Sequence, residues 1–235
     1  MEKQFLIITP SRVSALPMEP AMGPLSLYTF AVKNGFDGDL LDFNELITEE
    51  NISDYEAIVN SSLEQWLSSH PEAKIIGISA LFSGIFTRAL NIAKNVKKIR
   101  SDVAVVIGGN HPSIFPKEII ENCPEIDYIV IGEGEEQFVS LLKLYSQGSA
   151  TKVEIDNGIA YRSDGKVVIK EKRSYINELD SLGVTNYDQV DFAKFHTPDM
   201  ETWYNPKKHD IICAMPIATS RACPYNCNFC SMNAV

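Results

Sequence analysis

Short apolar runs alternate with longer segments of helical period from residue 1 to about residue 147. The runs are rich in β-branched residues and most are apolar throughout, as strands buried on both faces of a sheet are. This alternation predicts an α/β domain with a doubly wound, five-stranded parallel sheet. We favour the strand order 2-1-3-4-5, whose topological switch point lies between the first and third strands. The predicted strands are Gln4–Thr9, Gly38–Asp42, Lys74–Ser79, Val103–Gly108 and Tyr128–Ile131.

Apolar positions three and four residues apart predict helices that pack one face on this sheet. A first helix is predicted over Leu25–Lys33 and ends at Asn34-Gly35, because glycine adopts left-handed dihedral angles without a steric penalty. The connection before it, Pro10–Pro24, is unusually long, and long loops at the carboxyl ends of strands are where such folds bind ligands. Three further stripes consist of Ile52, Tyr55, Ile58, Val59, Leu63, Trp66 and Leu67, of Phe86, Ala89, Leu90, Ala93, Val96 and Ile99, and of Phe138, Leu141, Leu142 and Tyr145.

The pattern changes after Gly148. Gly158–Ile169 predicts a β-hairpin with Ser163-Asp164-Gly165 as its turn. Residues 171 to about 208 carry scattered charges and few apolar repeats, which indicates a linker crossing a domain surface. Ile211–Thr219 is again apolar and strand-like. We therefore divide the chain into an α/β domain over 1–147, a hairpin and linker over 148–208, and the start of a second domain over 209–235.

The 31 acidic residues exceed the 21 basic ones and give a net charge of -10. This balance argues against binding of nucleic acid or anionic lipid through bulk electrostatics, although it leaves room for a local basic patch. The apolar run Phe5–Ile8 is too short for a signal peptide or a membrane span. We expect a cytoplasmic protein with neither nucleic acid nor a membrane as partner.

The five cysteines are unevenly placed: Cys123 and Cys213 stand alone, and Cys223, Cys227 and Cys230 form a C-x3-C-x2-C cluster. An odd count without a secretion signal indicates a metal or metal-sulfur site rather than a disulfide framework. A closed zinc site or an ordinary four-iron cluster has four protein ligands, whereas three thiolates leave one iron open to another molecule. The cluster therefore points to chemistry at an open iron.

A zinc knuckle with Cys213 or His209 as fourth ligand is the structural alternative. Zinc sites usually pair their cysteines as two separated C-x2-C units, which this chain lacks. The metal-sulfur interpretation is therefore favoured.

The segment Thr219–Ser231 resembles the signature loop of radical S-adenosylmethionine (radical SAM) enzymes. The resemblance implies that the three clustered cysteines hold a [4Fe-4S] cluster, whose fourth iron binds the amino and carboxylate groups of SAM. It further implies cleavage of SAM to a 5′-deoxyadenosyl radical, a contact of the Phe229 backbone with adenine, and an electron donor such as flavodoxin or ferredoxin. Two departures are Ala222, where relatives often have glycine, and Pro216, since proline suits an edge strand or bulge better than a central strand.

Glycine-containing motifs follow three of the predicted strands, at the edge where an open parallel sheet binds ligands. They are Gly77-Ile78-Ser79-Ala80-Leu81, Gly108-Gly109-Asn110-His111-Pro112-Ser113 and Gly132-Glu133-Gly134-Glu135. Glycines let a ligand approach the backbone closely, and a helix starting near Glu135 presents free amide groups. Each motif alone equally fits a tight strand-to-helix turn.

Together with the cysteine loop, these motifs make residues 1–147 similar to the cobalamin-binding domain that precedes the barrel in one large subgroup of radical SAM enzymes. The resemblance implies cobalamin on the carboxyl edge of the sheet, with its nucleotide tail near Ser79, Gly108 and Gly109. The other candidate contacts at this edge are His111, Gly132, Glu133 and Gly134.

None of the four histidines lies in the Asp-x-His-x-x-Gly context of enzymes that ligate cobalt from below with histidine. This absence is usual in the radical SAM subgroup, and it is equally what a domain that has lost cobalamin would show. His111 is either a ligand contact or a structural turn residue. A receiver-type signalling domain would need acidic residues and a lysine where this chain has Thr9 and Gly132, so that alternative is poor.

The sequence thus predicts the N-terminal portion of a cobalamin-dependent radical SAM enzyme acting on a small-molecule substrate, with methyl transfer to an unactivated carbon as leading reaction. Other members of the subgroup catalyse ring formation or rearrangement. The alternative is a non-catalytic module that binds cobalamin or another flat ligand. A SAM-cleaving barrel needs roughly 200 residues or more, and only about 30 follow the linker, so we expect a fragment without substrate turnover.

Overall fold

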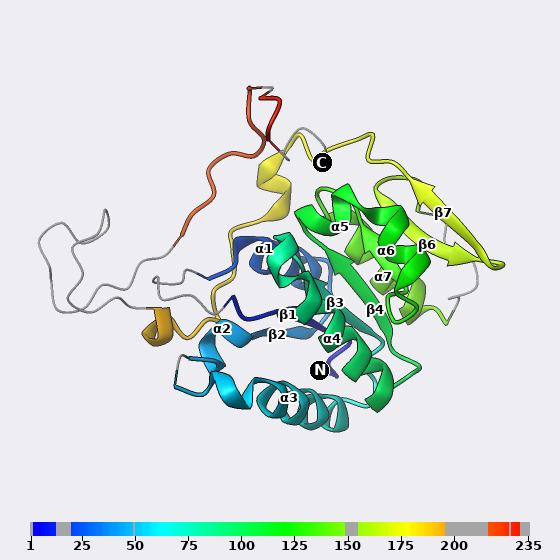
Figure 1. Ribbon diagram of the computed structural model, residues 1–235. Coiled ribbons are helices and arrows are strands. Elements are labelled where there is room, and N and C mark those ends of the chain that lie inside the picture. Colours follow the sequence, from blue (N-terminus) through cyan, green and yellow to red (C-terminus); the bar gives the residue numbers. More distant parts are fainter. Residues whose placement is uncertain are drawn as a thin grey trace, which may run out of the picture.

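The computed structural model describes residues 2–12, 20–48, 50–148, 155–195, 216–225 and 227–230. Its centre is one sheet with the strand order β2-β1-β3-β4-β5-β6-β7 (Figure 1). The first five strands pair in parallel in the predicted order 2-1-3-4-5, which confirms the doubly wound α/β fold. The strands are β1 Phe5–Thr9, β2 Gly38–Asp42, β3 Ile75–Ser79, β4 Ala104–Gly108, β5 Tyr128–Val130, β6 Ile159–Ser163 and β7 Lys166–Lys170.

Helices cover both faces of the sheet and enclose two apolar cores (Figure 1). Helices α3 and α4 pack on one face through residues such as Leu63 and Ile92, and α6 joins them through Ile120. Helices α1 and α7 pack on the other face through Tyr28 and Phe138. The helices are α1 Met22–Lys33, α2 Phe43–Leu46, α3 Tyr55–Ser69, α4 Ser83–Ile99, α5 Asn110–Ile114, α6 Pro116–Asn122 and α7 Glu135–Ser146, with short 3-10 helices at Ile52–Asp54, Leu179–Leu182 and Phe192–Phe195.

The predicted hairpin forms, but it corrects the expected strand count from five to seven. Its strand β6 pairs antiparallel with β5, and β7 pairs with β6. Asp164 and Gly165 at the turn have φ of 49° and 71°, the left-handed values that such a tight hairpin turn requires. Burial explains why the hairpin joins the sheet: Ile159 and Ala160 are fully buried and cover the edge that β5 would otherwise expose.

The segment after β7, residues 171–195, is called the strap. It crosses the surface of the α/β domain, passing over α1 and the start of α7, and is drawn in yellow in Figure 1. The amide of Ile176 donates to Glu133 Oε2 at 2.8 Å, and the amide of Asn186 donates to Thr29 Oγ1 at 2.8 Å. These bonds hold the predicted linker against the domain.

Beyond the strap, the structure describes residues 216–225 and 227–230, which run without helix or strand. The strand predicted at Ile211–Thr219 is therefore not seen over residues 216–219, and its first part lies outside the described residues. The hydroxyl of Tyr187 donates to the backbone oxygen of Pro216, so the segment starts close to the strap. His196, His209 and Cys213 lie outside the described residues.

Among the helices that the structure describes, none is long and apolar enough to cross a membrane.

Candidate functional site

The carboxyl ends of β3 and β4 lie side by side at the predicted ligand edge. Ser79 and Gly108 are register partners, and the amide of Ala80 donates to the Gly108 oxygen at 2.7 Å. Gly109 has a φ of +112°, and a Cβ there would lie 2.7 Å from the Ala80 oxygen. At Gly109 the fold itself thus requires glycine, whereas a Cβ on Gly108 would meet nothing closer than Val130 at 3.8 Å.

Ser113 joins the turn after β4 to the turn after β5. Its side chain is buried, and its hydroxyl donates to the Gly109 oxygen at 2.8 Å and accepts from the Gly132 amide at 2.9 Å. Ser113 stands within one of the predicted motifs, but the sequence alone assigned it no role. A serine hydroxyl in a helix commonly bonds the backbone oxygen four residues earlier, and that is the signal that could have identified it.

His111 follows in the same turn and is fixed by three side chains. Its Nδ1 lies 2.9 Å from Ser83 Oγ, and its ring centroid lies 4.5 Å from that of Phe86 and 5.2 Å from that of Phe115. Burial lowers the pKa of His111 below its usual value, so the imidazole is neutral at neutral pH. These contacts give His111 a structural role, and its contact with a ligand stays a prediction.

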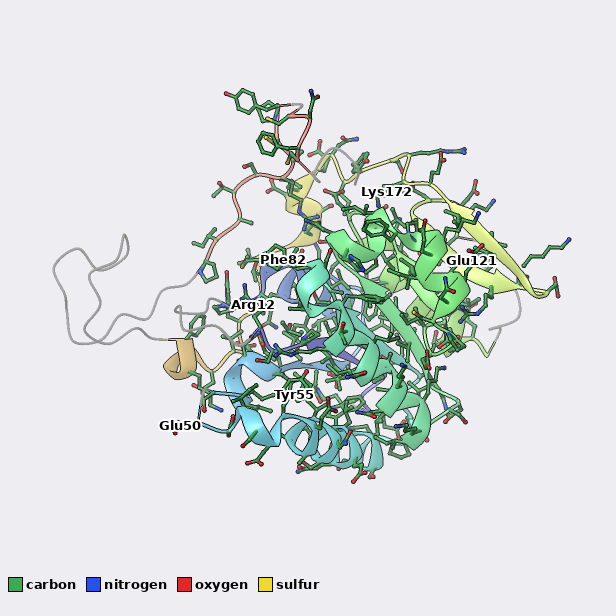
Figure 2. All side chains as sticks on the ribbon, viewed as in Figure 1. Arg12, Glu50, Tyr55, Phe82, Glu121 and Lys172 are labelled. Atoms are coloured by element: carbon green, nitrogen blue, oxygen red, sulfur yellow. The ribbon has the colours of Figure 1, made fainter. Side chains whose placement is uncertain are left out.

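We call a group of residues at this edge the shelf: Leu81, Phe82, Phe86, His111 and Phe115. Phe86 and Phe115 contact the His111 ring, and Leu81 and Phe82 directly precede Ser83, whose hydroxyl lies against His111 Nδ1. Leu81, Phe82 and Phe115 are 40%, 54% and 42% exposed, although they are large and apolar. Figure 2 labels Phe82 next to the first turn of α4. Large apolar groups that gather in the open commonly mark a binding site. The shelf offers apolar surface at the carboxyl edge of the sheet, the chemistry that a broad, flat ligand needs.

The turn after β5 faces a different set of partners. Glu133 accepts from the Ile176 amide through its side chain, and its backbone oxygen accepts from Lys172 Nζ at 2.7 Å. A Cβ on Gly134 would lie 3.0 Å from Val130 Cγ1. Burial is the largest influence on Lys172 and lowers its pKa. Glu133 is thus bound to the strap.

The structure therefore divides the predicted cofactor contacts into two groups. Hydrogen bonds and strand register join Ser79, Gly108, Gly109 and Gly132, and His111 lies in the same turn as Gly109. Glu133 and Gly134 are occupied by the strap and by Val130. The next residue, Glu135, is only 3% exposed and was not among the predicted site residues.

The cysteine loop lies at the end of the irregular C-terminal segment. Cys223 and Cys227 are exposed, Cys230 is half-buried, and the Cys230 amide donates to the Cys227 oxygen at 3.0 Å. Phe229, the predicted adenine contact, is 93% exposed. Ala222, where the signature often has glycine, has a φ of +66°, which is the backbone conformation that glycine adopts most easily.

Within the residues that the structure describes, no group of three or more His, Cys, Asp or Glu side chains is placed to hold a metal ion. The thiol groups have the donor chemistry and the number that a three-cysteine cluster site needs, but they do not converge on one point. The assignment of Cys223, Cys227 and Cys230 as metal ligands therefore stays a prediction, and so does the zinc alternative, because Cys213 and His209 lie outside the described ranges.

Comparison with known proteins identifies the family of the α/β domain. The family of the B12 binding domain matches residues 19–142, more than half of the chain. An uncharacterized methyltransferase of Pyrococcus horikoshii is 34% identical over 157 residues, which are 67% of this chain and 31% of that protein. The anaerobic magnesium-protoporphyrin IX monomethyl ester cyclase of Rubrivivax gelatinosus is 32% identical over 161 residues, 67% of this chain and 26% of that protein.

The fold has a counterpart among solved structures. The radical S-adenosylmethionine methyltransferase TsrM from Kitasatospora setae, solved with cobalamin and a [4Fe-4S] cluster bound, matches 73% of this chain and 31% of its own, with a TM-score of 0.55 at 19% identity. The chain thus spans about a third or less of the length of these relatives. The predicted resemblance to a cobalamin-binding domain is confirmed. The chain belongs to the B12-binding domain family.

Proposed function

We propose that this chain holds cobalamin against the shelf, at the carboxyl edge of the parallel sheet. The observation that carries the proposal is the exposure of Leu81, Phe82 and Phe115 at this edge, in a chain of the B12-binding domain family. Open α/β sheets bind ligands beyond the carboxyl ends of their strands. The residues present fit the group, because a corrin ring is broad and flat and takes up apolar surface.

The residues of the chain have distinct tasks in this proposal. The shelf residues exclude water from one face of the ring, and a neutral His111 does so without a charge that would need solvation. The register pair Ser79 and Gly108 offers a place for the nucleotide tail, since a Cβ on Gly108 has no close neighbour. Gly109 and Ser113 keep the two turns in place.

Retention of cobalt tests the proposal. The anaerobic chain is mixed with hydroxocobalamin and freed of excess ligand, and its spectrum and cobalt content are measured. We expect about one cobalt per chain. The affinity for cobalamin should be at least tenfold lower for Phe82→Asp, because burial of an aromatic side chain contributes about 1.5–3 kcal/mol. Ile169→Asp is the matched control, since Ile169 is 37% exposed on β7, away from the shelf. No retained cobalt in a folded chain, or equal loss in both variants, contradicts the proposal.

We further propose that Cys223, Cys227 and Cys230 bind a [4Fe-4S] cluster and that the chain is part of a cobalamin-dependent radical SAM enzyme in a reducing, cytoplasmic compartment. When bound, the cluster supplies the electron that cleaves SAM, and cobalamin supplies a methyl group. An electron donor such as flavodoxin or ferredoxin and a small-molecule substrate complete the scheme. The relatives named a methyltransferase support methyl transfer, and the one named a cyclase supports ring formation as the other reaction type.

Iron content tests the cluster. After anaerobic reconstitution we expect about four irons per chain, as a four-iron cluster requires. Cys227→Ala should lose this iron, because two thiolates remain. Cys123→Ala should keep it, since Cys123 is buried in the core of the α/β domain. Equal iron in the two variants would exclude the three-cysteine site.

A second candidate function is a cobalamin-binding module without catalysis, since the family match covers residues 19–142 and not the cysteine loop. In that case the chain retains cobalt but takes up no iron. The two measurements above therefore separate the enzyme from the module.

A further inference from the structure

Arg221 lies two residues before the first clustered cysteine, and its side chain reaches into the α/β domain. Its Nη2 donates to Glu135 Oε1 at 2.5 Å and lies 2.9 Å from Ser26 Oγ, and its Nη1 lies 3.5 Å from Glu133 Oε1. The guanidinium therefore contacts α1, the start of α7 and the turn after β5. Through this one side chain, the segment that carries the cysteines is joined to three separate parts of the domain.

The partner of Arg221 is a buried carboxylate. The side chain of Glu135 is 4% exposed, against 27% for Arg221. Glu135 is the first residue of α7, where the helix dipole favours a negative charge, and it also accepts from Ser26 Oγ at 2.7 Å. A buried charge that loses its partner is strongly unfavourable, so Glu135 holds the guanidinium in one place.

Ionisation supports this pairing. Burial is the largest influence on Glu135 and would raise its pKa, but the hydrogen bonds from Arg221 and Ser26 and the charge of Arg221 lower the pKa overall. The Glu135 carboxylate is therefore charged at neutral pH, as an arginine side chain always is.

The strap brings Arg221 to this place. Its bonds to Glu133 and Thr29, and the bond from Tyr187 to the Pro216 oxygen, lead the chain back across α1. Directly after Arg221 the backbone turns through Ala222 with positive φ into the cysteine loop. The position of the loop is thus set on one side by the Arg221 side chain.

We propose that Arg221 is a positioning residue that fixes the cysteine loop to the cobalamin-binding domain through the buried Glu135 carboxylate. The inference rests on the proposed function in one respect. The loop is proposed to carry a cluster, and that cluster must lie at a fixed place relative to the shelf. The loop's attachment itself is a property of the iron-free chain.

Pulsed EPR distances on the iron-free, full-length chain test this attachment. One nitroxide is placed on Cys223 and one on an exposed position of α3 through Glu64→Cys, with the other four cysteines changed to serine or alanine. With Arg221 present we expect one narrow distance distribution. Arg221→Gln should widen the distance distribution at least twofold. Arg221→Lys keeps the charge but lacks the forked guanidinium, so its distribution should have an intermediate width. Arg100→Gln is the matched control, because Arg100 forms a similar forked pair with Asp102 away from the loop.

Two further variants separate positioning from folding. Glu135→Gln should widen the distribution as much as Arg221→Gln, and the double variant should be no wider than either, since the two residues act as one unit. The double variant leaves no unpaired buried charge, so its distance distribution can be measured in place of that of Arg221→Gln if the single variant does not fold. A broad distribution in the parent chain, or an unchanged one in Arg221→Gln and in the double variant, overturns the proposal. Because no iron is present, failure of the cluster proposal leaves this result interpretable.

Discussion

The turns after β4 and β5 look alike in sequence but have different roles in the structure. Both follow a parallel strand, have two glycines at or after the end of that strand, and lead into a helix. The turn after β4 presents His111 beside exposed aromatic rings. The turn after β5 directs Glu133 and Glu135 toward the strap and Arg221. The comparison teaches that position on the carboxyl edge does not make a motif a ligand site, because one turn remains open and the other is occupied by the protein itself.

The largest expected effect tests the fold requirement at the first turn. Gly109→Ala should lower the free energy of unfolding by about 3 kcal/mol or more, because the Cβ combines an unfavourable φ with a backbone clash. Urea unfolding of the cofactor-free chain measures it. Gly108→Ala is the control and should stay within about 0.5 kcal/mol. Similar losses in both would show that the close approach to Ala80 does not matter.

A smaller effect is expected where the two turns are joined. Ser113→Ala removes the hydroxyl that bridges Gly109 and Gly132, so it should cost about 1–3 kcal/mol in the same unfolding experiment. Ser140→Ala removes a hydroxyl from the exposed side of α7 and should change the free energy of unfolding by less than about 0.5 kcal/mol. Equal values for the two serines would mean that the turns do not support each other.

A carboxylate after β2 contrasts with the paired Glu135. Burial, followed by the charge of Asp42, raises the pKa of Glu45 to about 7. The folded state therefore binds this proton more tightly than the unfolded chain, and stability falls as the pH rises from about 4.5 to about 7. Glu45→Gln should remove about 1 kcal/mol of this fall, a value reduced for partial exposure. Glu64 is exposed on α3, so Glu64→Gln is the control. Unfolding profiles between pH 4 and 8 that match for the parent chain and both variants would refute the role of Glu45.

The smallest effect is expected at the second turn. Gly134 has a φ of -110°, so alanine fits the backbone, and its Cβ would meet only side-chain atoms among its near neighbours, Val130 at 3.0 Å and Leu27 at 3.4 Å. Alanine lowers the conformational entropy of the unfolded chain, which offsets these contacts. The free energy of unfolding of Gly134→Ala should therefore stay within about 0.5 kcal/mol of that of the parent chain. A loss as large as that of Gly109→Ala would remove the difference between the two turns.

The parallel part of the fold was predictable because local patterns determine it. Each of the five strands was located to within one residue at either end, as for Val103–Gly108, which the structure places at Ala104–Gly108. The first helix begins at Met22 rather than Leu25, and the helices α5 and α6 were not identified. Both are short, with prolines at 112 and 116, so neither shows an apolar stripe of useful length.

What the sequence did not predict depends on contacts between distant residues. The hairpin was identified, but its pairing with β5 was not. The unpaired backbone groups of an edge strand can bond a strand from any part of the chain, so sequence distance does not indicate the partner. The glycines, Ser79 and His111 lie at the carboxyl edge of the sheet, as the strand assignment predicted, and their contact with a ligand stays a prediction. The burial of Glu135 was missed, since a Gly-Glu-Gly-Glu string reads as exposed and its partner is 86 residues away.

That separation affects how the protein is made. Ribosomes add about 5–20 residues per second, so Arg221 is synthesised roughly 4–17 seconds after Glu135, which lies 86 residues earlier. During this interval the sheet and α7 can already fold, and Ser26 is available to the carboxylate while the guanidinium is not. The nascent domain must therefore keep the start of α7 hydrated until the arginine emerges. Closure of this ion pair therefore follows the synthesis of the α/β domain, and the cysteine loop reaches its place only once that domain exists to receive it.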